Sequence, residues 1–278
     1  MSKAGTTPRR QSLIGDCAAA FVLLSRLPTG WHQFPADNPP NFTSSLWSFP
    51  VVGLVIGSAT GLTLSGAAAL ALPPLVAAAL AIFVSLLLSG AMHEDGLADM
   101  ADGFGGGHDV ESKIRIMHDS RIGSYGVMAL VLASLARAGL LIAASAQFAG
   151  MALVLIIALA HAASRFLPSL QLAIAPVSPH AKLASLTGHG GSLRMLAGLA
   201  IWALPLGFLF GWAAACSAAL LCSVMAMGVA KLAQRQVGGL TGDVMGATII
   251  LGELLFLAGV IIIVELPLTN FEQGLFGA

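Results

Sequence analysis

The sequence predicts an all-α, polytopic integral membrane protein, a helical bundle with about seven transmembrane helices and additional interfacial amphipathic helices. Hydrophobic residues make up 57% of the 278 positions and charged residues 9%, and the mean hydropathy is +0.88. Apolar stretches of about 20 residues, the length that crosses a hydrocarbon core as a helix, recur along the chain. The formal net charge is zero, so nothing favours nucleic acid as a partner. We expect one membrane-embedded domain over residues 1–278.

The N-terminal segment, residues 1–45, is expected to lie at the membrane interface. Basic residues precede a short apolar stretch, as in a secretory signal, but Asp16 and Arg26 bracket that stretch and no A-x-A-like cleavage site follows. An uncleaved helix that lies on the bilayer or is buried fits better. The loop PTGWHQFPADNPPNFTSS comes next, and its prolines exclude a continuous helix.

The remaining apolar stretches predict the membrane spans. We place seven of them, uncertain by one, from length and hydropathy. They cover residues of about 46–66, 73–91, 123–146, 151–171, 195–211, 213–230 and 246–265.

The basic residues predict the orientation of these spans. Lys and Arg gather in the N-terminal segment and in the connections 92–122, 172–194 and 231–245, whereas the alternate connections carry none. Because Lys and Arg favour cytoplasmic loops, the N-terminus is expected inside and the C-terminus outside. Arg137 and Arg165 fall within spans, where a charge indicates either a functional site or a pair between helices.

The segment HEDGLADMADG, residues 93–103, is the best candidate for chemistry. If the preceding helix continues past His93, Asp95, Asp99 and Asp102 stand at i, i+4 and i+7 on one face. Such carboxylates repel one another unless they share a cation, and Mg²⁺ prefers hard oxygen ligands and binds substrate phosphates. Glu94 would reach a second ion only if the helix bends.

The next segment, residues 109–119, has the pattern of an amphipathic helix lying on the cytoplasmic surface. Its polar side offers the i, i+4 pairs of Asp109 with Lys113 and Glu111 with Arg115. These cations, and Arg121 in DSRIGSYG, could neutralise phosphate oxygens. Plain surface pairing is an equally good interpretation of the first two, whereas a functional role is favoured for Arg121.

A second polar segment, GGLTGDVMGA at 238–247, precedes the last span on the same side of the membrane. Thr241 offers a hydroxyl, and Asp243 either completes a two-metal site or caps the final helix. Glu253, further along that helix, is expected to face the same region.

At these residues the sequence resembles the cobalamin synthase (adenosylcobinamide-GDP ribazoletransferase) family of bacteria and archaea. After Pro176 the sequence departs from the family's pattern, with VSPHAKLASLTGHGG in place of a Tyr-Ala-Arg and acidic stretch. The matching segments are LLSRLPTG at 23–30, FPVVGLVIG at 49–57, HEDGLADMADGFGGG at 93–107, MHDSRIGSYGVMALVL at 117–132, SRFLP at 164–168 and GGLTGDVMGA at 238–247.

The resemblance implies an Mg²⁺-dependent phosphotransferase in the bacterial inner membrane with its site facing the cytoplasm. A ribose hydroxyl of α-ribazole or its 5′-phosphate would attack adenosylcobinamide-GDP, GMP would leave, and adenosylcobalamin or its 5′-phosphate would form. A carboxylate or His93 would take the proton. The implied catalytic residues are Asp95, Asp99, Asp102, Arg121 and His93. The implied metal ligands are Asp95, Asp99, Asp102, Glu94 and Asp243, and the implied substrate-binding residues are Arg26, Lys113, Arg115, Asp119, Arg165 and Thr241.

Two other classes of protein fit the pattern less well. A CDP-alcohol phosphotransferase also places acids at a membrane edge, but HEDGLADMADGFGGG lacks its Ala-Arg pair and its later Gly-x-x-x-Asp-x-x-x-Asp. A cation transporter should carry its acids near mid-span in broken helices, whereas the acids here cluster outside the predicted spans. The lipid bilayer is an expected partner in every case, and a homo-oligomer is left open.

Overall fold

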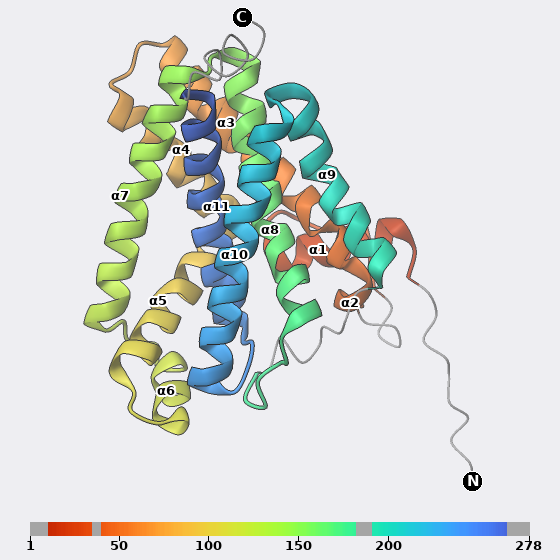
Figure 1. Cartoon of the computed structure of the whole chain (residues 1–278), viewed down its shortest axis with the longest axis vertical. Helices are drawn as coiled ribbons and strands as arrows, with labels where there is room; N and C mark the ends of the chain where they lie inside the picture. The colour runs from red at the N-terminus through yellow and green to blue at the C-terminus, as the bar shows by residue number, and fades with distance from the viewer. Residues whose placement is uncertain (1–10, 35–39, 182–190, 266–278) are drawn as a thin grey trace, which may run out of the picture.

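The computed structural model describes residues 11–34, 40–181 and 191–265, and this part of the chain is helical with no β-strand (Figure 1). The all-α membrane bundle expected from composition is confirmed. Along the chain follow α1 (Leu13–Leu24), α2 (Phe42–Ser45), the 3-10 turn η1 (Leu46–Ser48), α3 (Phe49–Ala69), α4 (Pro74–Ser89), α5 (Met92–Gly106), α6 (Val110–Met117), α7 (Ser124–Gln147), α8 (Gly150–Ile174), α9 (Ser192–Phe210), α10 (Trp212–Val237) and α11 (Gly242–Glu265).

The long helices correspond to the predicted spans. Among the described residues, 6 helices are long and apolar enough to cross a membrane, or up to 7 if α4 and α5 are counted as one bent span. The largest difference in length is in α10, which continues through Lys231 and Arg235 to Val237, because both basic residues are good helix formers. The basic N-terminal residues before position 11 and residues 182–190 of the connection 172–194 lie outside the described residues.

The expectation that the second span runs straight into the acidic segment is wrong. The axes of α4 and α5 differ by 91°. Gly90 ends α4 in the left-handed conformation at φ 69°, and Ala91 follows at φ 56°. A left-handed residue cannot continue a right-handed helix, so the chain turns here and α5 begins anew.

Helices α3 and α8 pack at unusually close range. Gly53, Gly57 and Gly61 recur every four residues on α3, and a Cβ at Gly57 would lie 2.7 Å from the Cα of Ala158 on α8. Small residues at this spacing let two helix backbones touch, as in many membrane bundles. Helix α8 is thereby held in the centre of the bundle, where most of its residues are buried.

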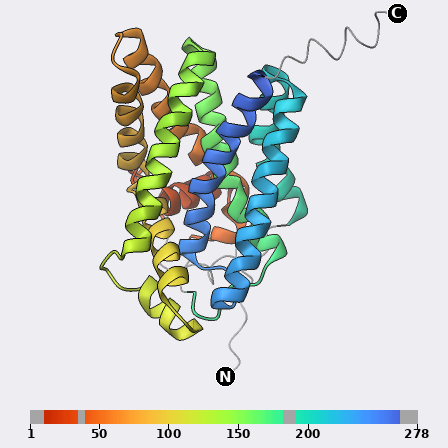
Figure 2. The same cartoon turned by 60° about the vertical axis from the view of Figure 1, so that its left-hand side comes forward.

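The polar connections gather at one end of the bundle. Helices α5 and α6 and the turn between α10 and α11 lie at the lower end in Figures 1 and 2, whereas the turns α3–α4, α7–α8 and α9–α10 lie at the opposite end. This arrangement matches the alternation of basic and uncharged connections in the sequence. The acidic segment and the start of α11 are therefore brought to the same end of the molecule.

Candidate active site

A cavity of about 280 Å³ opens at the polar end of the bundle, between α1, α5, α6, α8 and α11. Its wall is apolar toward α1 and α8, where Leu23, Leu24 and Leu172 line it. Its polar lining residues include His93, Asp95, His118, His180, Thr241 and Asp243. A largely apolar cavity with a few convergent polar groups is typical of a small-molecule site.

Two of the acids predicted as metal ligands, Asp95 and Asp243, line this cavity, one from each of two helices. Asp95 lies in the first turn of α5 and Asp243 in the first turn of α11, and Asp99 stands one turn after Asp95. Gly96 allows the two helices to touch, because a Cβ there would lie 2.8 Å from the carbonyl oxygen of Asp243. The ion pairs among the described residues involve none of these three carboxylates. The Thr241 hydroxyl donates to Oδ2 of Asp243 at 3.5 Å, and hard oxygen donors outside any ion pair therefore stand on both walls.

The cap of α11 is Thr241 rather than Asp243. The Thr241 hydroxyl accepts a hydrogen bond from the backbone N–H of Val244 at 3.2 Å, which is the usual geometry of an N-cap. The interpretation of Asp243 as the cap is therefore wrong, and its carboxylate is left to face the cavity. Thr241 lines the cavity as well, as its predicted substrate-binding role requires.

Asp102 has a different environment from the other acids of α5. It is 7% exposed, and its two oxygens accept hydrogen bonds from the backbone N–H groups of Gly123 at 2.7 Å and Gly126 at 2.8 Å. Asp102 thus caps the N-terminus of α7, whose own N-cap residue is a glycine. Among the described residues, no group of at least three His, Cys, Asp and Glu side chains is arranged to hold a metal ion, and the metal role of Asp102 stays a prediction.

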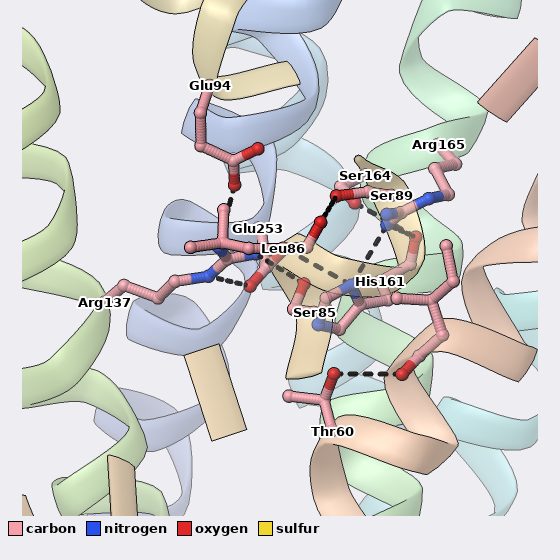
Figure 3. Close-up of polar contacts among 11 residues, drawn as sticks. Thr60, Ser85, Leu86, Ser89, Glu94, Arg137, His161, Ser164, Arg165 and Glu253 are labelled. Atoms are coloured by element: carbon pink, nitrogen blue, oxygen red, sulfur yellow. Dashed lines mark hydrogen bonds and ion pairs between the residues drawn. The ribbon is translucent and has the colours of Figure 1, made fainter. Parts of the chain in front are cut away.

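Glu94, the other predicted ligand on α5, points into the protein interior. Arg137 on α7 donates to it at 3.0 Å and to both oxygens of Glu253 on α11 at 2.6 Å (Figure 3). The interpretation of Arg137 as part of a pair between helices is confirmed. Glu253 belongs to this interior network and does not line the cavity.

Arg165 is buried beside the same network. It is 1% exposed and donates to Nδ1 of His161 at 3.0 Å and to the His161 carbonyl at 3.2 Å. Pro168 and Leu172 follow on the same helix and line the cavity, but Arg165 does not. Sequence reasoning did not single out His161, although a histidine in the otherwise apolar stretch ALAHAAS was a signal for it.

The remaining predicted cations lie outside the cavity, and no Lys or Arg of the described residues lines it. The backbone N–H of Arg26 donates to Leu88, and its side chain packs beside Gly90. Arg115 is exposed, and Lys113 donates to Gln236 at 2.5 Å. The i, i+4 pair with Asp109 is not formed, because Asp109 caps α6 by accepting from the backbone of Ser112.

Arg121 is held at the surface by Asp119. Its side chain is 87% exposed and lies 2.8 Å from the carboxylate. The hydrogen bonds that Arg121 donates lower the pKa of Asp119 to about 2.

Two histidines that line the cavity, His118 and His180, were given no specific role from the sequence. Spacing along the chain does not show which loops fold over a helix end.

The fold and the cavity define a polytopic helical membrane protein with an acid-lined site at its polar end. The chain belongs to the cobalamin-5-phosphate synthase family, whose model matches residues 16–261. It is 38% identical over 262 residues to the adenosylcobinamide-GDP ribazoletransferase of Azorhizobium caulinodans, covering 91% of this chain and 98% of that protein. The identically named protein of Bradyrhizobium diazoefficiens is 38% identical, with 89% and 93% covered. No solved structure matched the chain.

Proposed function

We propose that this chain joins adenosylcobinamide-GDP to α-ribazole or its 5′-phosphate, with release of GMP. The observation that carries the proposal is its similarity along about nine tenths of its length to proteins named adenosylcobinamide-GDP ribazoletransferase. In the reaction, a ribose hydroxyl oxygen bonds to the phosphorus nearest cobinamide, the bond from that phosphorus to the bridging oxygen breaks, and GMP leaves with that oxygen. The hydroxyl proton passes to a base, and adenosylcobalamin or its 5′-phosphate is the product.

The cavity suits the diphosphate part of such a substrate. Its volume of about 280 Å³ lies just below the range of about 300–1,000 Å³ that is typical of pockets for drug-sized ligands. The corrin ring and guanosine would then extend beyond it. The leucines of α1 and the apolar face of α8 would exclude water from the reacting phosphorus, which strengthens every electrostatic contact there.

The charge of the cavity supports Mg²⁺ as the partner of the diphosphate. Asp95 and Asp243 line the cavity, and its described lining contains no Lys or Arg. A diphosphate would therefore need a cation between its phosphates and these carboxylates to bind there. Asp95, Asp99 and Asp243 would hold Mg²⁺, which supplies neutralisation of the phosphate charge. His93 and Thr241 would orient the substrate through hydrogen bonds, and His93 or a carboxylate would accept the hydroxyl proton.

The proposed location is the bacterial inner membrane with the cavity facing the cytoplasm. The polar connections that surround the cavity carry the Lys and Arg residues, which favour the cytoplasmic side. Adenosylcobinamide-GDP and α-ribazole 5′-phosphate carry phosphate groups and would reach the site from that side without crossing the bilayer.

GMP release tests the proposal. Purified protein in lipid vesicles receives Mg²⁺, adenosylcobinamide-GDP and α-ribazole 5′-phosphate, and GMP is measured by chromatography. Release should require all three components and stop on addition of EDTA. Matched reactions with a CDP-alcohol lipid substrate should yield no CMP. Absence of GMP from the complete mixture, or release of CMP instead, would refute the proposed function.

A further inference from the structure

A largely buried ion network joins three helices of the bundle. Arg137 of α7 contacts Glu94 of α5 and Glu253 of α11, and the side chains of these residues are 7%, 18% and 2% exposed (Figure 3). The guanidinium uses Nε and one terminal nitrogen for the two oxygens of Glu253, and the other terminal nitrogen for Glu94. One cation thus bridges two carboxylates from two different helices.

Stability alone does not explain this network. Burying charged groups carries a desolvation cost that their attraction often fails to exceed, and well-packed apolar residues would hold the helices at least as firmly. An ion network does, however, fix the register of the helices that it joins, because only one arrangement satisfies the fork of an arginine. The network is therefore better explained by the register that it imposes on the helices than by a gain in stability.

The two carboxylates stand on the helices that carry the acids of the cavity. Glu94 immediately precedes Asp95 on α5, and Glu253 lies on α11, which opens with Asp243. Gly96 packs directly against the backbone of Asp243, and one carboxylate of each helix, Asp95 and Asp243, lines the cavity. Their like charges push α5 and α11 apart, and a fastening between the two helices opposes that repulsion.

Helix α5 is also not a straight continuation of the helix before it. The 91° bend at Gly90 and Ala91 separates it from α4, so the direction of α5 depends on contacts that it makes itself. Among the described residues, α5 forms one ion pair with the rest of the bundle, and this is the pair of Glu94 with Arg137.

We infer that Arg137 is a positioning residue that fastens α5 to α11 and so sets the spacing between Asp95 and Asp99 on one side and Asp243 on the other. The inference rests on the proposed function, because it assigns those aspartates to the site. Arg137 touches no substrate and acts through the two helices.

Glu94→Gln, Arg137→Lys and the double variant test the inference, with Thr248→Val as the matched control. Thr248 is buried on α11; its hydroxyl accepts from Gln171 of α8 at 2.8 Å and donates to the carbonyl of Val244 on its own helix at 2.8 Å. Three quantities are measured: kcat and KM for GMP release, binding of Mn²⁺ alone by the loss of its free EPR signal, and the unfolding temperature in detergent.

Loosening α5 should lower kcat and weaken Mn²⁺ binding by about 10-fold to 100-fold while KM for adenosylcobinamide-GDP changes little, because small misplacements of a site are costly. Both single variants should show this, and the double variant should be no worse than either. The control should keep wild-type kcat and Mn²⁺ binding even where its unfolding temperature falls.

Three results would overturn the inference. The first is a Glu94→Gln protein with the Mn²⁺ binding and kcat of the wild type. The second is a loss of kcat in the variants that disappears once kcat is corrected for the fraction of folded protein. If Arg137→Lys binds Mn²⁺ normally while Glu94→Gln does not, Glu94 is itself a ligand and Arg137 positions nothing. A wild-type protein that binds Mn²⁺ but releases no GMP refutes the proposed function, and the Mn²⁺ comparison still decides the role of Arg137.

Discussion

Carboxylates that look equivalent in the sequence have different environments in the structure. Helical spacing predicted that Asp95, Asp99 and Asp102 share a face, and Asp95 does line the cavity. The same spacing could not show that Asp102 meets the backbone of α7, because a periodicity identifies a face but not the neighbour that covers it. For Glu94 the sequence favoured a metal, whereas the structure pairs it with Arg137.

Asp95→Ala and Asp99→Ala should abolish GMP release while the protein still inserts and folds. Each change removes one of the carboxylates proposed to hold the metal ion together with Asp243, and the described lining of the cavity offers no Lys or Arg to neutralise the diphosphate in its place. The assay is GMP release per folded protein in vesicles, and Glu111→Ala on the exposed side of α6 serves as the control. Near-normal turnover in either aspartate variant would contradict the metal role.

Asp102→Ala should instead lower the free energy of unfolding, by about 1–3 kcal/mol, because it leaves the N–H groups of Gly123 and Gly126 without an acceptor. Unfolding in detergent with increasing denaturant measures the loss. An inactive Asp102→Ala protein with wild-type stability would show that this side chain serves the metal and not the helix.

At the scale of the elements, the sequence predicted where helices lie better than how they meet. Apolar length located the spans, since a helix must satisfy its own backbone in lipid. The break at Gly90 was missed, because the apolar run and the acidic run are contiguous and a single glycine does not specify a left-handed residue. The glycines of α3 allow close packing of helices, but the sequence alone does not identify α8 as the partner, which only the structure shows.

Gly57→Ala should destabilise the bundle, because the added Cβ would lie 2.7 Å from the Cα of Ala158 and force α3 away from α8. Gly66→Ala is the matched control on the same helix, since nothing lies within 4 Å of its Cβ position. The unfolding temperature in detergent is compared for the two proteins. We expect a clear fall for Gly57→Ala and an equal or higher value for Gly66→Ala, where alanine is the better helix former; equal values would contradict the close packing.

For the whole molecule, charge alternation and architecture agree on which connections share a side. The cavity lies at the end where the basic connections gather, so we expect this end to face the cytoplasm. A reporter that is active only in the periplasm, fused after residue 278, should therefore be active, whereas one inserted between α5 and α6 should be silent. The reverse pattern, or activity at neither place, would contradict the proposed orientation.

The central claim is that the aspartates of α5 and α11 hold a divalent cation against a diphosphate. A crystal structure with Mn²⁺ and adenosylcobinamide-GDP, with the metal located by anomalous scattering, tests it most directly. We predict an anomalous peak at about 2.0–2.2 Å from carboxylate oxygens of Asp95 and Asp243, with the diphosphate on its other side. Those side chains pointing into open water, with the nearest ion elsewhere, would contradict the claim.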